Sequence, residues 1–248
     1  MNLKGKVAVV AGASGGIGRE ISKALAKEGV EVLLVARRRE ILEALKKTIE
    51  AEGGKAEIYT SDLTKESTVK ELTAKIGADY KNIDLLFNSA GYGVYKKLPD
   101  ISFEEWERSF SVNVDSVFLL SQKLMPLLTK SLKAYVVSMG SGMGKVALSG
   151  RSPYCASKFA LRGLMLSLAK EYKKTNVKFV LLTMGSILTS FGPLTVDEKK
   201  KKSEKGKEYI DPVWLAHHIV SKIKHDTLED EVPIYPSHYF EESRKDKR

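Results

Sequence analysis

The sequence predicts an α/β fold: a doubly wound parallel sheet of about seven strands with helices on both faces. Short apolar runs alternate with longer amphipathic stretches along the 248 residues, a pattern typical of parallel strands joined by crossover helices. A glycine-rich turn follows the first apolar run directly and leads into a helical pattern. Because the chain shows no internal repeat and no linker, residues 1–248 are expected to form a single domain.

Strands are expected where a short apolar run is bounded by turn residues. They lie at residues 6–11, 31–36, 56–60, 84–88, 134–138, 178–183 and 232–235. The last of these is expected at the edge of the sheet, because Pro233 and Pro236 are tolerable only there.

Helices are expected where apolar residues recur at helical spacing. They lie at residues 16–28, 65–80, 103–129, 153–174 and 212–225. A further helix is expected between the end of the second strand and residue 52. Pro126 is expected to kink the helix that contains it. The segment 190–208 has six lysines and no clear apolar period, so it is interpreted as a mobile flap. Its lysine run at 199–202 is interpreted as a solvated helix face, and the tail 241–248 as frayed.

The composition is that of a soluble globular protein. Hydrophobic residues make up 43% and charged residues 29% of the chain, which is too apolar for a disordered chain and too charged for a membrane protein. No apolar stretch has the length of a membrane span, and no signal peptide is recognisable. Cys155 is the one cysteine, so an internal disulfide is excluded, and no Cys/His set has zinc-site spacing. We expect a cytoplasmic protein without a metal.

The charge balance raises the possibility of a nucleic-acid partner. The chain has 41 Lys and Arg against 31 Asp and Glu, a net charge of +10. The excess is spread along the sequence, however, and no basic stripe or nucleic-acid motif is present. We therefore expect no nucleic-acid partner.

The glycine-rich turn has the features of a pyrophosphate site. Gly12, Gly16 and Gly18 follow the first strand and open the first helix. A pyrophosphate binds backbone N–H groups at a helix N-terminus, where the backbone must approach the ligand closely. The spacing G-x-x-x-G-x-G differs from the stricter dinucleotide fingerprint. A tight turn that packs the helix against the strand remains the alternative.

The end of the second strand favours NADP(H) over NAD(H). An NAD site places an acidic residue on the ribose about twenty residues after the glycine turn, but here the sequence has Arg37, Arg38 and Arg39. Cations at a helix N-terminus oppose the helix dipole, and a 2′-phosphate would reverse that sign. Arg37 is the first candidate for this phosphate and Arg38 the second, with a solvated arginine cluster as the alternative.

Three residues have the chemistry of a carbonyl reductase. Tyr154 and Lys158 are four apart on one expected helix and so share a face, and Ser141 follows the fifth strand. Tyrosine, with an ordinary pKa near 10, is a poor acid and base at neutral pH. The ammonium of Lys158 is expected to lower that pKa toward neutrality, while the Ser141 hydroxyl holds the substrate oxygen. A surface tyrosine beside a solvated lysine is the alternative for the pair alone.

Taken together, these motifs resemble the short-chain dehydrogenase/reductase family, over about residues 5 to 225. The resemblance rests on the order and separation of several motifs. These are the glycine turn, Asp62-Leu63, Asn88-Ser89-Ala90-Gly91, Asn113, and the set of Ser141, Tyr154 and Lys158. The resemblance implies a Rossmann-type fold and a homo-oligomer, either a dimer or a tetramer. Gly15 stands where some NADP-dependent members carry a basic residue, so phosphate selection depends on Arg37 and Arg38.

The resemblance also implies a set of functional residues. Its catalytic set is Asn113, Ser141, Tyr154 and Lys158. Asn113 would hold a water of a proton relay through its backbone, and Ile187 and Thr189 would meet the nicotinamide carboxamide. The cofactor-binding set is Gly12, Ser14, Gly16, Ile17, Gly18, Arg37, Arg38, Asp62, Leu63, Asn88, Ala90, Gly91, Tyr154, Lys158, Ile187 and Thr189.

The expected function is therefore hydride transfer between NADP(H) and a ketone, aldehyde or secondary alcohol, with Tyr154 as proton donor or acceptor. The substrate pocket is expected to be largely apolar and aromatic, which favours an apolar carbonyl compound. Its expected lining is residues 92–95, Met143, residues 149–151, residues 184–187 and the flap. The alternative is a non-catalytic NADP-sensing regulatory or scaffold protein on the same fold, because a fold does not dictate its function.

Overall fold

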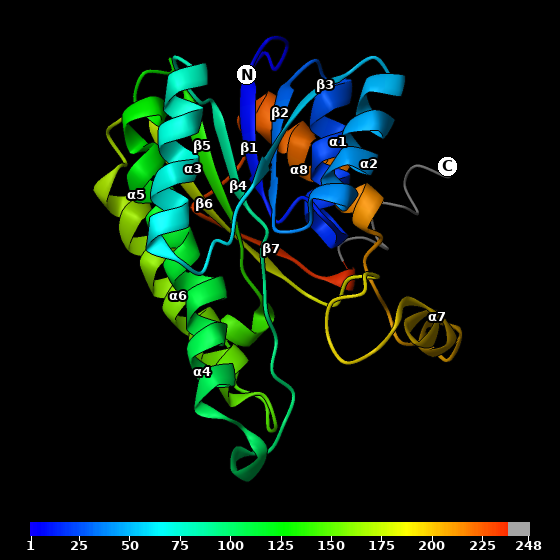
Figure 1. The fold of residues 1–248 in the computed structure, drawn as a ribbon. Coiled ribbons are helices and arrows are strands. Elements are labelled where there is room, and N and C mark those ends of the chain that lie inside the picture. The colour runs from blue at the N-terminus through cyan, green and yellow to red at the C-terminus, as the bar shows by residue number, and fades with distance from the viewer. Residues whose placement is uncertain (238–248) are drawn as a thin grey trace.

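The computed structural model describes residues 1–237 and contains one seven-stranded sheet (Figure 1). The strand order is β3-β2-β1-β4-β5-β6-β7, and every neighbouring pair is parallel. The strands are β1 Val7–Ala11, β2 Glu31–Ala36, β3 Lys55–Thr60, β4 Leu85–Asn88, β5 Ala134–Met139, β6 Val177–Met184 and β7 Glu231–Ile234. The predicted doubly wound parallel sheet is confirmed. β7 pairs with β6 at the edge of the sheet, which accommodates Pro233.

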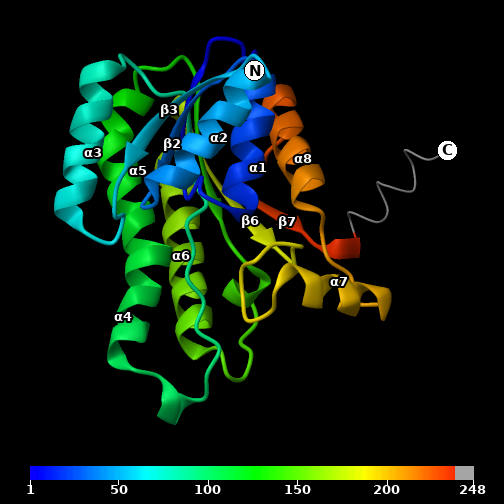
Figure 2. The same cartoon turned by 45° about the vertical axis from the view of Figure 1, so that its right-hand side comes forward.

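Helices cover both faces of this sheet (Figures 1 and 2). They are α1 Gly16–Lys27, α2 Arg39–Ala51, α3 Glu66–Asp79, α4 Phe103–Phe110, α5 Ser116–Leu128, α6 Ser152–Glu171, α7 Val196–Glu204 and α8 Pro212–His225. α1, α2 and α8 pack on one face, while α3, α5 and α6 pack on the other. No helix in the described part of the chain is both long enough and apolar enough to cross a membrane.

Alternation along the strands divides the buried side chains into two cores. In β1, Ala8 and Val10 join the core beneath α1, α2 and α8, whereas Val9 and Ala11 join the core beneath α3, α5 and α6. Successive strand residues point to opposite faces, so a continuously apolar strand requires cover on both sides. The short apolar runs of the sequence are therefore explained by this two-layered cover.

The helix predicted at residues 103–129 is interrupted. α4 and α5 are joined by a π-helical turn over Ser111–Asp115, with a backbone hydrogen bond from Ser116 to the Ser111 carbonyl. A π-turn inserts one residue into the helical repeat and often lies at a functional site. The apolar period continues through it, so the sequence pattern does not reveal it. Pro126 lies in the last turn of α5.

The predicted flap at 190–208 contains a helix, α7, which is not among the expected helices, although the lysine run within it is interpreted as a helix face. Thr195 and Glu198 form a capping box in which each side chain accepts a hydrogen bond from the other's backbone N–H. Lys199 is buried and donates hydrogen bonds to backbone carbonyls, so the interpretation of the run 199–202 as a solvated helix face is wrong for this residue. The tail 241–248, predicted to fray, lies outside the described residues.

Glu231 at the start of β7 ties the edge of the sheet to its neighbours. Its carboxylate accepts hydrogen bonds from the Arg162 guanidinium at 2.8 and 3.1 Å and from the Thr183 hydroxyl at 2.6 Å. The Lys145 ammonium lies 3.0 Å away. The Arg162 hydrogen bonds are the main cause that lowers the pKa of Glu231 from 4.5 to about 2. This carboxylate therefore links β6, β7, α6 and the loop that follows β5.

We expect Glu231→Gln to lower the free energy of unfolding near pH 7 by about 1 to 3 kcal/mol. Because the folded-state pKa is depressed, the Glu231 contribution is fully present above its ordinary pKa of 4.5 and declines as the pH falls toward about 2. Urea unfolding at several pH values measures this. The difference between wild type and variant should shrink across that window, whereas Glu229→Gln, at an exposed site, should behave like wild type. A difference that does not change with pH would contradict the assignment.

Candidate active site

The turns after six strands converge on one cavity of about 1050 Å³. The residue that directly follows each of these strands lines it: Gly12, Arg37, Ser61, Ser89, Gly140 and Gly185. β1 lies between β2 and β4, so the direction of chain winding reverses here. Open α/β sheets bind their ligands at the carboxyl ends of the strands at such a reversal.

The glycine turn brings two backbone segments into close contact. Gly12 has a φ of +84°, and a Cβ there would lie 2.5 Å from the Ala90 backbone nitrogen. A Cβ on Gly18 would lie 2.4 Å from the Gly12 carbonyl oxygen. Gly18 does not line the cavity. Its lack of a side chain allows α1 to pack closely against the turn. Both positions require glycine because the backbones touch.

The N-terminus of α1 opens into the cavity and fits a pyrophosphate. Ser14, Gly15, Gly16 and Ile17 line this part of the wall. Apart from Ile17 the residues there are serine and glycine, and the first N–H groups of a helix have no partner within the helix. The residues present therefore fit the phosphates of a dinucleotide.

At the far end of the cavity, Arg37, Asp62 and Leu63 line the wall together. Burial raises the pKa of Asp62, but hydrogen bonds from Thr64 outweigh it, and the nearby Arg37 charge lowers the pKa further. Arg38 is the N-cap residue of α2 and is exposed, and it is not among the lining residues. The cavity thus has Arg37, the first candidate for phosphate selection, in its wall.

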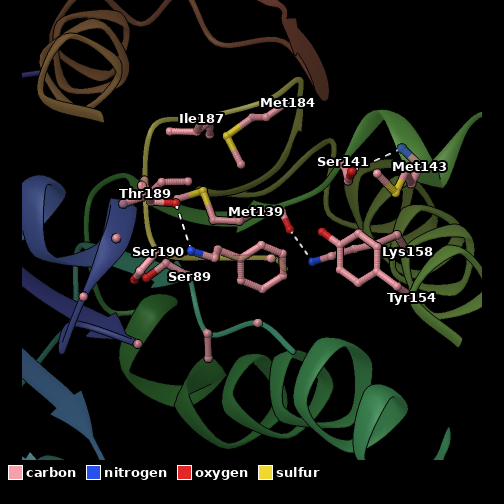
Figure 3. Close-up of a pocket in the computed structure, with 18 of the residues that line it drawn as sticks. Ser89, Met139, Ser141, Met143, Tyr154, Lys158, Met184, Ile187, Thr189 and Ser190 are labelled. Atoms are coloured by element: carbon pink, nitrogen blue, oxygen red, sulfur yellow. Dashed lines mark hydrogen bonds between the residues drawn. The ribbon is translucent and has the colours of Figure 1, made fainter. Parts of the chain in front are cut away.

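Tyr154 and Lys158 point into the cavity side by side from the first turns of α6 (Figure 3). The Lys158 Nζ lies 5.7 Å from the centroid of the Tyr154 ring and donates a 2.8 Å hydrogen bond to the Met139 carbonyl at the end of β5. Both side chains are buried, with 6% and 4% of their surface exposed. The structure therefore brings this pair together on one helix face, against the end of a central strand.

Ser141 approaches the same tyrosine from the loop after β5. Its hydroxyl lies near enough to the Tyr154 phenol to lower the pKa of that phenol, and it accepts a 3.1 Å hydrogen bond from the Met143 backbone N–H. The serine, the tyrosine and the lysine thus form one group at the cavity wall.

Burial controls the titration of both groups. Burial raises the pKa of Tyr154 above its ordinary value of 10.0, and the Ser141 hydroxyl lowers it only in part. Burial lowers the pKa of Lys158 from 10.5 to about 8. The expected fall of the Tyr154 pKa toward neutrality is therefore not found in the protein, because loss of water penalises the phenolate. At neutral pH the phenol keeps its proton.

Asn113 and Asn88 are buried behind the cavity wall rather than lining it. Asn113, in the π-turn, accepts a hydrogen bond from the Tyr92 N–H at 2.9 Å and donates to the Tyr92 carbonyl at 2.8 Å. It also donates to the Ser157 hydroxyl on α6. Asn88 donates to Ser138, and its Oδ1 has no hydrogen-bond partner within the described chain. The Asn113 side chain thus connects the π-turn to the loop after β4 and to α6.

Most of the predicted site residues line the cavity, whereas Gly18, Arg38, Asn88 and Asn113 do not. Those that line the cavity are Gly12, Ser14, Gly16, Ile17, Arg37, Asp62, Leu63, Ala90, Gly91, Ser141, Tyr154, Lys158, Ile187 and Thr189. Of the expected substrate lining, Tyr95, Met143 and Arg151 contribute, as do residues 184–187 and, from the flap, residues 190–194, Lys199, Lys202 and Lys207. The sequence analysis missed Val146, Leu148 and Tyr209, which lie in segments with no motif, and Val112, which directly precedes Asn113. Residues 1–237 contain no cluster of His, Cys, Asp and Glu that could hold a metal ion.

A sequence model of the short chain dehydrogenase family matches residues 6–200. The chain belongs to the short-chain dehydrogenase/reductase family. It is 31% identical over 208 residues to a 3-oxoacyl-(acyl-carrier-protein) reductase, FabG, of Thermotoga maritima, which covers 84% of this chain and 82% of that protein. It is 35% identical over 191 residues to a fatty acyl-CoA reductase of Acinetobacter baylyi, which covers 76% of this chain and 64% of the reductase. It is also 30% identical over 225 residues to the glycine betaine reductase ATRR of Emericella nidulans. That match covers 90% of this chain but only 18% of the length of the reductase.

A solved structure agrees with this assignment. The crystal structure of a metagenomic short-chain oxidoreductase in complex with NADP superimposes with a TM-score of 0.79, at 30% identity, and covers 95% of this chain and 99% of that one. Solved structures of proteins that are 21 to 24% identical to this chain share its fold. The family to which this short-chain dehydrogenase belongs thus includes reductases and an oxidoreductase whose structure was solved with NADP.

Proposed function

We propose that this short-chain dehydrogenase transfers a hydride between NADP(H) and a ketone, aldehyde or secondary alcohol. The observation that carries the proposal is the group of Ser141, Tyr154 and Lys158 in the wall of the cavity that the N-terminus of α1 also lines. A proton donor and a dinucleotide cradle in one cavity are what carbonyl reduction requires.

The side chains have separate roles in this proposal. NADP(H), when bound, supplies or accepts the hydride. The Tyr154 hydroxyl gives its proton to the carbonyl oxygen during reduction, and its raised pKa keeps that proton in place beforehand. The Lys158 ammonium, 5.7 Å from the ring, stabilises the phenolate that remains. The Ser141 hydroxyl donates a hydrogen bond to the substrate oxygen and holds it beside the phenol.

We propose an apolar substrate. Tyr95 and Phe191 lie beside the Tyr154 ring. The cavity wall also includes the apolar side chains Met143, Val146, Leu148 and Leu194. Such a wall favours apolar groups through the area it removes from water. NADPH consumption across a panel of carbonyl compounds tests the activity, and turnover of carboxylated compounds alone would contradict the substrate class.

We also propose that the protein is a homo-oligomer. Trp106 on α4, Phe118 on α5 and Phe159 on α6 are apolar and expose 38%, 44% and 46% of their surface, and exposed apolar side chains gathered on neighbouring elements mark interaction surfaces. We expect light scattering to give the mass of a dimer or tetramer, and Phe159→Glu to shift it toward the monomer. A monomeric mass for the wild type would contradict this.

Tyr154→Phe should lower kcat by about 10²- to 10⁴-fold, the range for loss of a general acid. The phenylalanine ring keeps the contacts with Tyr95 and Phe191, so the fold and NADPH binding should persist. Tyr172→Phe, at the other end of α6, is the matched control and should keep wild-type kcat. Wild-type turnover by Tyr154→Phe would favour the non-catalytic, NADP-sensing alternative or another mechanism.

Arg37→Ala should lower kcat/KM for NADPH by about 10- to 100-fold while leaving the value for NADH nearly unchanged, because only NADPH has a 2′-phosphate to pair with the guanidinium. Arg39→Ala is the control, since Arg39 pairs with Glu43 at 2.8 Å and does not line the cavity. Equal losses with both cofactors would contradict a role in phosphate selection.

A further inference from the structure

A buried lysine lies in the segment between β6 and α8, outside the group of Ser141, Tyr154 and Lys158. Lys199 has 7% of its surface exposed, whereas its neighbour Lys200 is exposed. The Lys199 Nζ lies 2.7 Å from the Thr189 carbonyl, 2.6 Å from the Phe191 carbonyl and 3.4 Å from the Ile187 carbonyl. An ammonium has three N–H donors, so these carbonyls match its full capacity.

The position of Lys199 is not explained by the helix that carries it. The capping box of Thr195 and Glu198 places Lys199 at the first turn of α7, where a cation opposes the helix dipole. Burial of an ammonium also costs free energy unless its hydrogen bonds are satisfied, and burial lowers the pKa of this lysine. What offsets both costs is the set of carbonyls in the loop 187–191.

That loop extends from the glycine turn to the tyrosine. Ile187, Thr189 and Phe191 all line the cavity. The Thr189 side chain lies 3.8 Å from the place of a Cβ on Gly16, at the start of α1. The Phe191 ring lies 5.7 Å from the Tyr154 ring, centroid to centroid. Figure 3 shows Ile187, Thr189 and Ser190 of this loop across the cavity from Tyr154 and Lys158.

Backbone hydrogen bonds to another described segment are found only at the base of this excursion. Within the loop, the Thr189 N–H donates to the Ile187 carbonyl at 2.9 Å and the Phe191 N–H donates to the Thr189 hydroxyl at 3.4 Å. The Leu188 N–H donates to the Ile210 carbonyl, and the Ile210 N–H donates to the Ser186 carbonyl, each at 2.9 Å. Beyond this bridge, the Lys199 ammonium connects α7 to the carbonyls of Thr189 and Phe191. The Lys199 side chain therefore ties the outer part of the loop to a helix that follows it in sequence.

We propose that Lys199 is a positioning residue that fixes the loop 187–191, so that Thr189 faces the glycine turn and Phe191 faces Tyr154. The link to cofactor binding and turnover rests on the proposed function; the link to loop order does not. Lys199 also lines the cavity, but its N–H donors are engaged by the loop carbonyls, so in this proposal it acts through the backbone of the loop.

The test compares Lys199→Met with Lys200→Met, which removes a lysine from the exposed neighbouring position. Hydrogen exchange measures the order of the loop, fluorescence titration measures the Kd for NADPH, and steady-state kinetics give kcat and KM. For Lys199→Met we expect the amides of Thr189 and Phe191 to exchange at least about tenfold faster, the Leu188 amide in the bridge to Ile210 to change little, and the Kd for NADPH to rise about tenfold. Because Lys199 is the one buried residue of α7, this helix contributes little to the core, and we expect the Tm of Lys199→Met to change little. Lys200→Met should match wild type in exchange, Kd, kcat and KM.

A chemical rescue separates the ammonium from simple packing. Lys199→Cys in a Cys155→Ala background, alkylated with bromoethylamine, carries an amine of nearly the original length, and we expect it to recover both slow exchange and NADPH affinity. Unchanged exchange in Lys199→Met would overturn the proposal, as would faster exchange with wild-type Kd and kcat, because Lys199 would then support the fold alone. Absence of NADPH binding and carbonyl turnover in the wild type would instead refute the proposed function.

Discussion

The parallel direction of all the strands is the constraint on which the site depends. Each crossover returns the chain to the same end of the sheet, so residues far apart in sequence follow neighbouring strands at one edge. Ser89 after β4, Gly140 after β5 and Gly185 after β6 line the same cavity for this reason alone. The helices on both faces then exclude water from the sheet, and the strand ends are left as the place where polar groups from separate segments meet.

Much of this arrangement could be predicted because it follows local rules. A strand buried on both faces is continuously apolar, and the expected strands lie close to the observed ones. Tyr154 and Lys158 share a helix face because they are one turn apart, and Ser141 meets them because it follows a neighbouring strand. The glycines at 12 and 18 were recognisable as special, although only the structure shows that Gly18 serves backbone packing instead of lining the cavity.

What could not be predicted depends on contacts between segments. The π-turn at Ser111–Asp115 leaves the apolar period intact, so no pattern marks it. Lys199 belongs to a run of four lysines whose members look alike in sequence, yet one of them meets three carbonyls and is buried. The Tyr154 pKa rises because the cavity wall removes water from the phenol, and a helical spacing of four residues contains no information on burial.

Two buried lysines on opposite walls of the cavity are stabilised in the same way. Lys158 donates to the Met139 carbonyl at the end of β5, and Lys199 donates to carbonyls of the loop after β6. Burial lowers the pKa of each lysine. Because the carbonyls are neutral, their hydrogen bonds satisfy the ammonium groups without cancelling the positive charge. A carboxylate partner would have neutralised each lysine and weakened the attraction of the cavity for an anionic dinucleotide. Backbone carbonyls thus allow the protein to fix two segments of the cavity wall while keeping the positive potential that a phosphate-bearing ligand requires.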